Sequence, residues 1–382
     1  MQPPVSIPFN RPFLTGKETD YIRQAVESGK ISGNGLFTRR CQEFLERRCG
    51  FRKVLLTTSC TDALEMAAIL ADVGPGDEVI VPSFTFVSSA LAFVRQGARI
   101  VFADSRADHP NLDLDQVAAL ITPRTKVLVV VHYAGVACDM DAVMALARQH
   151  DLLVVEDAAQ AIDATYKGRP LGGIGHLGAF SFHETKNVIS GEGGALVVND
   201  DRFARRAEII WEKGTNRAEF FRGEVNKYGW VDVGSSFLPS EIIAAFLYAQ
   251  LEHLDAIQAQ RKRLWQAYFD GLADLAARGF AARPSMPDFA SNNAHMFYLV
   301  CRSLDERTAL IAHLKARGVL AVFHYLPLHK SPFYAARHDG RELPCADRFA
   351  DGLVRLPMFY DLTTDQVAGI CAAIREFYAA RG

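Results

Sequence analysis

Short apolar runs alternate with segments of helical periodicity between about residues 53 and 198. Five runs rich in Val, Leu and Ile are each followed within two residues by a polar residue or proline: 54–56, 79–81, 100–102, 127–131 and 152–155. Apolar residues recur at helical spacing in 62–71 and 140–149. Continuous apolar runs are typical of strands covered on both faces. The alternation therefore predicts an α/β fold built on a mainly parallel sheet with right-handed crossovers.

The pattern changes after residue 200. Helices are predicted at 203–211, 240–254 and 252–268, and the third either extends the second or follows a bend. Short apolar runs at 298–300 and 321–323 then predict the strands of a smaller α+β unit. We therefore expect a large domain over residues 1–250 and a small C-terminal domain over residues 251–382.

Composition excludes several classes of protein. The 382 residues are 49% hydrophobic and 23% charged, with a net charge of −2, so no electrostatic footprint for nucleic acid or an anionic membrane is present. The first residues contain no basic segment followed by an apolar one, and no apolar run has the length of a membrane-spanning helix. These features predict a cytoplasmic enzyme or binding protein with no membrane partner.

The seven cysteines are scattered, and none forms a CxxC pair. This distribution argues against a disulfide framework and against a zinc site, so we expect no metal. Small buried thiols are the simplest interpretation, although Cys60 lies in a polar turn where a nucleophilic thiol remains an alternative.

A carboxylate and a lysine stand out within this pattern. The apolar run 152–155 ends in Glu156-Asp157, and Lys186 follows 29 positions after Asp157. A glycine-rich loop, Gly191-Glu192-Gly193-Gly194, comes just beyond the lysine. Pyridoxal phosphate requires a lysine amine for its aldehyde and a buried carboxylate that keeps its pyridine nitrogen protonated. Either residue alone would more often be an ordinary surface group.

Polar segments that follow the predicted strands extend this hypothesis. Ligands bind beyond the carboxyl ends of the strands in open parallel sheets. The segment Thr57-Thr58-Ser59-Cys60-Thr61 lies between a strand and a helix, where free amides suit a phosphate, although simple N-capping is the commoner reason for such residues. The segment Pro82-Ser83-Phe84-Thr85-Phe86 places aromatic rings nearby, for stacking or for the core. A buried Asp157 needs a partner, which a pyridinium, an arginine or a helix N-terminus could supply.

The motifs together resemble the DegT/DnrJ/EryC1/StrS family of pyridoxal-phosphate sugar aminotransferases. They are Pro82–Phe86, Glu156–Gln160, Ser181–Asn187 and Gly191–Gly194, and the resemblance extends from about Ile7 to about Phe359. It implies the type I aspartate aminotransferase fold. It also implies that Lys186 carries pyridoxal 5′-phosphate and that Asp157 holds the pyridine nitrogen. Further implied cofactor contacts come from Cys60, Thr61, Phe86, Ala159, Gln160 and Ser181.

Finer matches resemble one branch of the family. They lie at Phe37–Cys41, His132–Cys138, Lys213–Arg217 and Phe323–Tyr325. That branch transfers the amine of L-glutamate to C4 of dTDP-4-dehydro-6-deoxy-D-glucose with a galacto product, in the synthesis of enterobacterial common antigen and O-antigen lipopolysaccharide. The resemblance implies that the ketosugar lies near His183, Lys213, Arg217, His324 and Tyr325.

One departure from the family pattern concerns the segment before the long helix. Ser236 stands where the family usually has an asparagine that reaches the phosphate in the partner subunit's site. A hydroxyl can still donate one hydrogen bond, but its side chain is shorter. The resemblance further implies a homodimer, or a dimer of dimers, with sites at the subunit interface.

Four alternatives stay open at this point. A gluco product or amination at C3 would use the same cofactor residues. A sugar dehydratase of the family would carry histidine where Lys186 stands, and a non-catalytic binding or regulatory protein could keep the fold without the chemistry.

Overall fold

The computed structural model describes residues 6–381. Its largest element is a seven-stranded sheet with the order β1-β9-β8-β5-β4-β2-β3. The strands are β1 (Val54–Thr57), β2 (Glu78–Pro82), β3 (Arg99–Ala103), β4 (Thr125–Val131), β5 (Leu153–Asp157), β8 (Leu177–Ser181) and β9 (Gly194–Val198). All neighbouring strands are parallel except that β9 runs antiparallel to β1 and β8. The predicted mainly parallel α/β sheet is therefore confirmed.

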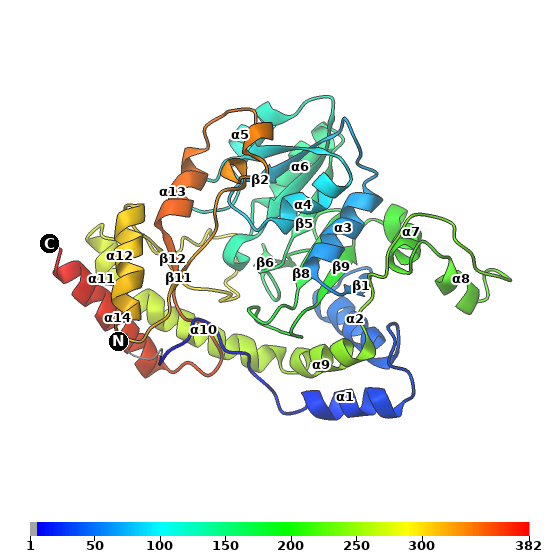
Figure 1. Ribbon diagram of the computed structural model, residues 1–382, viewed down its shortest axis with the longest axis horizontal. Coiled ribbons are helices and arrows are strands. Elements are labelled where there is room, and N and C mark those ends of the chain that lie inside the picture. The colour runs from blue at the N-terminus through cyan, green and yellow to red at the C-terminus, as the bar shows by residue number, and fades with distance from the viewer. Residues whose placement is uncertain (1–5, 382) are drawn as a thin grey trace.

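Helices cover both faces of this sheet (Figure 1). Along β4, Val127 and Val129 belong to one core and Leu128 and Val130 to the other, so each strand face is buried. The first core includes residues of α3 (Cys60–Leu70), α4 (Ser88–Arg95) and α7 (Asp201–Trp211). The second includes residues of α2 (Leu36–Cys49), α6 (Met140–Gln149) and α9 (Glu241–Leu251). Burial on both faces explains why these strands are continuously apolar.

The remaining elements of the N-terminal half are short or peripheral. They are α1 (Glu18–Glu27), α5 (Leu114–Leu120), α8 (Arg217–Phe221), the hairpin β6 (Thr165–Tyr166) and β7 (Arg169–Pro170), and the 3-10 turn η1 (Tyr133–Gly135). Helix α8 lies on an arm that projects from the molecule at the right of Figure 1. The polar stretch after residue 211 therefore contains a short helix that its sequence pattern did not reveal.

A second unit follows α9. Its three-stranded antiparallel sheet has the order β10-β12-β11, from β10 (Tyr298–Val300), β11 (Val322–Phe323) and β12 (Leu353–Arg355). Its helices are α10 (Leu254–Gly271), α11 (Ala273–Ala277), α12 (Leu304–Lys315), α13 (Pro344–Gly352) and α14 (Thr364–Ala379), with 3-10 turns η2 (Leu328–Lys330) and η3 (Ala335–Arg337). Helix α9 ends at Leu251 and α10 begins at Leu254, so the long helical segment is interrupted between them.

The two units meet within α10. Its first residue, Leu254, belongs to a core of the large sheet, whereas Leu264 and Trp265 belong to the core of the second unit. The division at residue 250 stays a prediction. Across residues 6–381, no helix combines the length and apolar character required to cross a bilayer.

Candidate active site

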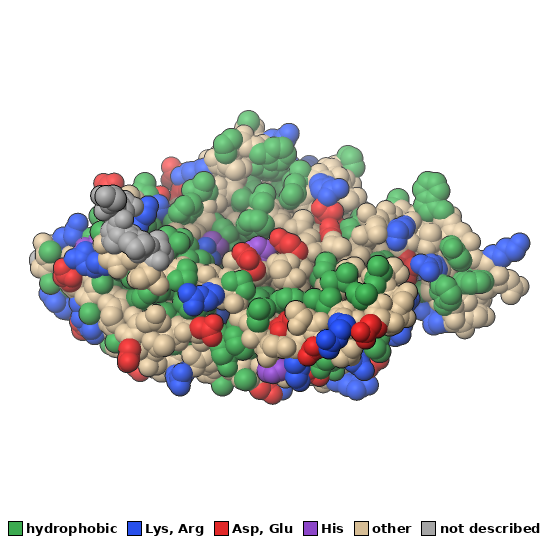
Figure 2. Space-filling view, turned by 60° about the horizontal axis from the view of Figure 1, so that its bottom comes forward, with side chains coloured by type: hydrophobic (Ala, Val, Ile, Leu, Met, Phe, Trp, Pro, Cys, Tyr) green, Lys and Arg blue, Asp and Glu red, His purple; other side chains and the backbone are tan. Residues whose placement is uncertain are grey.

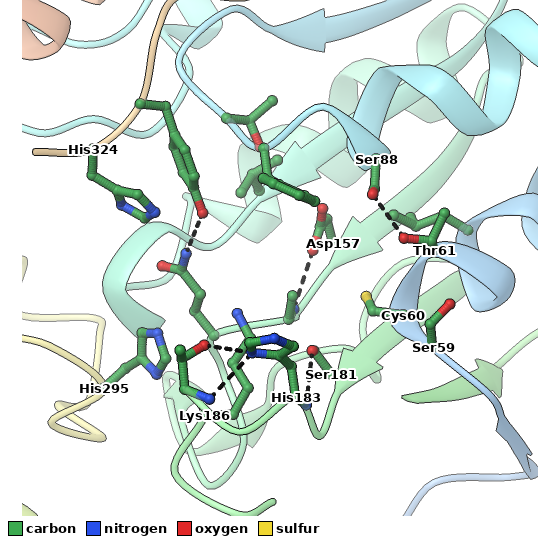
Figure 3. A pocket seen from close by; sticks show the side chains of 18 of the residues that line it. Ser59, Cys60, Thr61, Ser88, Asp157, Ser181, His183, Lys186, His295 and His324 are labelled. Atoms are coloured by element: carbon green, nitrogen blue, oxygen red, sulfur yellow. Dashed lines mark hydrogen bonds between the residues drawn. The ribbon is translucent and has the colours of Figure 1, made fainter. Parts of the chain in front are cut away.

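A cavity of about 460 Å³ opens where the parallel strands end. Asp157 closes β5 and Ser181 closes β8, while the N-terminus of α3 forms another wall. Figure 3 shows Cys60, Thr61 and Ser88 at one end, His295 and His324 at the other, and Asp157 and Lys186 between them. The cavity thus occupies the position at which open parallel sheets bind ligands.

Asp157 is 6% exposed and is fixed by two hydrogen bonds. Ser89 Oγ donates to Oδ2 at 2.6 Å, and the amide of Ala159 donates to Oδ1 at 3.1 Å. Ser89 lies in turn 2.8 Å from Thr85 Oγ1. No lysine or arginine of the described chain forms an ion pair with Asp157, so an arginine partner, one of the alternatives left open by the sequence, is not found.

Lys186 lies in the loop after β8 and lines the same cavity. Burial lowers the pKa of its amine, and the nearby carboxylate of Asp157 offsets this effect only in part. No atom within residues 6–381 accepts a hydrogen bond from Nζ. A neutral, unbound amine in a cavity is the form that attacks an aldehyde.

The N-terminus of α3 forms an anion-binding end. Ser59 caps the helix by accepting from the amide of Asp62 at 3.1 Å, so the simple capping interpretation holds for this residue. The amides of Cys60 and Thr61, however, have no acceptor within the described chain. Thr61 Oγ1 lies 2.7 Å from Ser88 Oγ, and Ser181 also lines the cavity. Free amides, hydroxyls and the helix dipole together suit a phosphate.

Glycine at position 194 lets α3 approach the sheet closely. Gly194 pairs with Thr57 of β1 and Ser181 of β8. A Cβ added there would lie 2.4 Å from the amide nitrogen of Cys60. The last glycine of the glycine-rich motif is therefore explained by the close packing of α3 against β9.

A hydrogen-bonded chain borders the opposite end. Gln160 accepts from the amide of Ala134 at 2.6 Å and donates to Tyr325 Oη at 3.2 Å. His324 Nδ1 lies 2.9 Å from Tyr133 Oη. Burial, with the nearby charges of Arg355 and Lys186, lowers the pKa of His324 well below its ordinary value, so the ring is neutral at physiological pH.

The two aromatic rings of the Pro82 segment have different environments. Phe84 is 1% exposed and contacts Tyr133, with ring centroids 5.4 Å apart, so it is a core residue. Phe86 is 55% exposed and lines the cavity, as does Ala159. Only Phe86 therefore has a face available to a flat ligand.

Burial raises the pKa of the Cys60 thiol well above its ordinary value, which argues against the alternative of a nucleophilic thiol.

His183, one of the residues predicted to lie near the ketosugar, lines the cavity. Its Nδ1 lies 2.9 Å from Thr185 Oγ1.

Three residues predicted for the site lie outside this cavity. Ser236 is exposed on the segment before α9. Lys213 lies in the turn after α7, and Arg217 begins α8, with Nη1 3.6 Å from Glu212. Their predicted roles require a second subunit and stay predictions.

Sequence reasoning missed several cavity residues: Thr85, Ser88, Glu192, His295 and Arg355. It also missed Ser89, which holds Asp157 from behind. Ser88 and Ser89 follow the Pro82–Phe86 motif after a single residue, so proximity to that motif was an available signal. His295 and Arg355 come from the second unit and carry no local signal.

Comparison with known proteins identifies the family of this chain. The sequence profile of the DegT/DnrJ/EryC1/StrS aminotransferase family matches residues 12–375. The chain belongs to this family. GDP-perosamine synthase from Caulobacter vibrioides is 34% identical over 372 residues, which are 96% of each chain. The dTDP-3-amino-3,4,6-trideoxy-alpha-D-glucose transaminase of Streptomyces venezuelae is 38% identical over 320 residues, which are 83% of this chain and 80% of that one.

Solved structures agree with this assignment. S. venezuelae DesV, in complex with a ketimine intermediate, superposes with a TM-score of 0.88 at 34% identity and covers 97% of this chain and 98% of its own. The PMP form of a putative sugar aminotransferase from Streptococcus pneumoniae has a TM-score of 0.91 at 26% identity and covers 98% of this chain and 100% of its own. The predicted family and the predicted type I aminotransferase fold are confirmed.

Proposed function

We propose that this chain transfers the amino group of L-glutamate to C4 of dTDP-4-dehydro-6-deoxy-D-glucose. The products are dTDP-4-amino-4,6-dideoxy-D-galactose and 2-oxoglutarate. The predicted cofactor, pyridoxal 5′-phosphate, is confirmed by the family and by neighbours solved in their PLP and PMP forms. The observation that carries the proposal is that Lys186, Asp157 and the first turn of α3, whose Cys60 and Thr61 amides have no acceptor within the described chain, surround one cavity. These three features match the aldehyde, the ring nitrogen and the phosphate of that cofactor.

The donor groups of the cavity fit the cofactor. The amides of Cys60 and Thr61, with the hydroxyls of Thr61, Ser88 and Ser181, would hold its phosphate. Asp157 would hold the ring nitrogen, and Gln160 the 3-hydroxyl. Phe86 and Ala159 would cover the two ring faces. When bound, the cofactor acts as an electron sink for a carbanion at the carbon that bears the amine.

Lys186 performs the proton transfers in this proposal. Its lowered pKa makes the free amine available as a general base, which removes the proton from Cα of glutamate. In the second half of the reaction the same residue, as general acid, delivers a proton to C4 of the sugar. Asp157, by keeping the ring nitrogen cationic, stabilises the negative charge that develops in both halves.

The sugar is proposed from the finer sequence matches. The names of the relatives include both a GDP sugar and a dTDP sugar, and one carries its amine at C3. C3 amination and a gluco product at C4 are therefore the runner-up reactions. Lysine acts from one side of the cofactor plane, so the orientation of the bound hexose selects the configuration at C4. Lys186 itself disfavours the dehydratase alternative, and an intact pair of Asp157 and Lys186 disfavours a non-catalytic protein.

We further propose that two chains form a homodimer, or a dimer of such dimers. Large apolar side chains are exposed on and after α8, notably Phe221 at 69% and Trp230 at 84%, a composition typical of a surface covered by a partner. Hydrophobic side chains gather on this projecting arm in Figure 2. In such a dimer Lys213, Arg217 and Ser236 would reach the partner's cavity. An active monomer in a mass measurement would rule this out.

Product analysis tests the reaction. The enzyme, loaded with pyridoxal phosphate, is incubated with glutamate and a panel of dTDP-, GDP- and UDP-ketosugars, and the products are examined by proton NMR. We expect the dTDP-4-ketosugar to be aminated with a small H3–H4 coupling, which marks an axial amine. A large coupling would show the gluco product, and amination only of 3-ketosugars would replace the proposed substrate.

A further inference from the structure

We propose that His295 accepts a hydrogen bond from the hydroxyl group at C3 of the ketosugar. His295 lies in the segment before β10 of the second unit and lines the cavity, where it shares one end with His324 (Figure 3). The assignment rests on the proposed aminotransferase reaction. It gives a substrate contact to a residue that no motif of the sequence identified.

Three hydrogen bonds fix the position of His295, which is 6% exposed. Its amide donates to Asn293 Oδ1 at 3.1 Å, and its carbonyl oxygen accepts from Arg261 Nη2 at 2.6 Å. Its ring nitrogen Nδ1 lies 2.8 Å from Asn187 Oδ1. Because Asn187 directly follows Lys186 in the chain, this bond holds the ring beside the loop that carries the lysine.

The surroundings of Asn187 decide which nitrogen of the ring carries the proton. Asn187 Nδ2 donates to the backbone carbonyl of Asn293 at 2.9 Å and to Gln258 Oε1 at 2.7 Å. A carbonyl oxygen can only accept, so Oδ1 of Asn187 faces His295, and Nδ1 of His295 donates to it. Burial, with the nearby charge of Lys186, lowers the pKa of His295 well below its ordinary value, so the ring is neutral. Nε2 therefore carries a lone pair, and no group within residues 6–381 donates to it.

His324 presents the opposite polarity at the same end of the cavity. Tyr133 Oη lies 2.9 Å from His324 Nδ1, and no other group of the described chain accepts from this hydroxyl. A buried hydroxyl needs an acceptor, so Tyr133 donates to Nδ1, and Nε2 of the neutral His324 ring carries the proton. One imidazole thus offers an acceptor and the other a donor. A hydroxyl group both donates and accepts, whereas a carboxylate or a phosphate only accepts, so the lone pair of His295 favours the sugar over the anionic groups of either substrate.

The proximity of Lys186 identifies the hydroxyl. The charge of Lys186 acts on both imidazoles, so this end of the cavity lies near the amine that delivers a proton to C4 of the sugar. In dTDP-4-dehydro-6-deoxy-D-glucose, C4 lies between C3, which bears a hydroxyl, and C5, which bears a methyl group and the ring oxygen. Neither substituent of C5 can donate a hydrogen bond. An acceptor beside C4 is therefore placed for the 3-hydroxyl.

A comparison of two sugars with two variants tests the contact. The sugars are dTDP-4-dehydro-6-deoxy-D-glucose and its 3-deoxy counterpart, and the acceptor half-reaction starts from the pyridoxamine form. In His295→Asn the new amide nitrogen can replace Nδ1 as the donor to Asn187, while the acceptor at Nε2 is lost. In His295→Gln the new amide oxygen can take the place of Nε2, while the bond to Asn187 is lost. His329→Asn is a matched control, because His329 is also buried, with Nδ1 2.7 Å from Ser83 Oγ and Nε2 without a partner, but it does not line this cavity.

We expect His295→Asn to raise the half-saturating concentration of the 3-hydroxy sugar by about three- to tenfold, the range for one neutral hydrogen bond. The values for the 3-deoxy sugar and for glutamate in the donor half-reaction should change less than about twofold. His295→Gln should recover part of the discrimination between the sugars, and His329→Asn should keep that of the wild type. Equal losses with both sugars, which a purely structural role would give, or no loss with the 3-hydroxy sugar would overturn the proposal.

A binding measurement separates this contact from the proposed reaction. Calorimetry with the pyridoxamine form uses dTDP-6-deoxy-D-glucose and its 3-deoxy counterpart, which have no ketone and do not turn over. We expect the wild type to bind the 3-hydroxy sugar about three- to tenfold more tightly, and His295→Asn to remove this difference. If the wild type fails to aminate the ketosugar, the proposed function fails, while this comparison still decides the role of His295. Equal binding of the two sugars by the wild type, or binding of neither, would contradict the contact.

Discussion

Glu156 precedes Asp157 in β5. Its replacement by glutamine gives a quantitative test of how much its buried hydrogen bonds stabilise the fold. The side chain is fully buried next to Asp157. Oε1 accepts from the amides of Ile174 at 2.7 Å and Gly175 at 2.5 Å. Oε2 accepts from the amide of Gly172 at 2.8 Å and from His132 Nε2 at 2.8 Å. The other ring nitrogen of His132 accepts from the Cys138 amide at 3.2 Å, so Nε2 carries the proton.

Four donors therefore converge on one carboxylate. In Glu156→Gln the amide oxygen satisfies two of them, and the NH₂ group faces the other two. Each hydrogen bond to a charged acceptor contributes about 1.5–3 kcal/mol, so losing two predicts a destabilisation of about 3–6 kcal/mol. A typical domain unfolds with only about 5–15 kcal/mol, so the change is a large fraction of the total.

Urea unfolding, followed by tryptophan fluorescence at a fixed cofactor concentration, measures the loss. Glu27→Gln is a suitable control because Glu27 is exposed on α1, and its free energy of unfolding should change by less than about 0.5 kcal/mol. A loss below about 1 kcal/mol for Glu156→Gln would refute the reasoning. Burial alone would raise the pKa of Glu156, but the hydrogen bonds from His132 and the glycine amides lower it below its ordinary 4.5. The ionised form therefore stabilises the fold above about pH 4.5, and the advantage of the wild type should shrink as the pH falls below that value.

Three further predictions concern the cavity. Asp157→Asn should retain the cofactor but lower turnover at least about a hundredfold, because an amide cannot keep the ring nitrogen cationic; near wild-type rates in a steady-state assay would contradict the role. Because burial lowers the pKa of Lys186 from 10.5, the rate at which apoenzyme captures pyridoxal phosphate should rise with pH and level off below that value, and a midpoint at or above 10.5 would argue against a desolvated amine. Gly194→Ala places a Cβ 2.4 Å from the Cys60 amide nitrogen, so cofactor affinity by equilibrium dialysis should fall, whereas an unchanged affinity would show that α3 can shift without loss.

Much of the large sheet could be predicted because its strands are buried on both faces. Strands β1 to β5 and helix α6 coincide with the predicted segments to within a few residues. Strands β8 and β9 were missed. Gly178 interrupts the apolar pattern of β8, and a strand that runs antiparallel beside parallel neighbours has no signature of its own. Strand β12 (Leu353–Arg355) was also missed, because it has only two apolar residues before an arginine and follows α13 without an intervening turn.

The residues of the site also differ in whether the sequence alone could predict them. Asp157 and Lys186 were identified because a strand end, a spacing and a glycine-rich loop are visible along the chain. Ser89 is separated from Asp157 by 68 positions, and only the folded sheet brings the hydroxyl to its carboxylate. Arg355 and His295 come from the second unit, so their place in the cavity depends on how the two units are joined, which no local pattern encodes.

Borohydride reduction of the loaded enzyme, followed by peptide mapping, tests the central claim most directly. Reduction fixes the pyridoxyl group to the lysine that carries the cofactor. The account predicts one modified peptide, which contains Lys186, and no visible cofactor absorbance in resting Lys186→Ala. Modification of a different lysine in the wild type would contradict the assignment of this cavity.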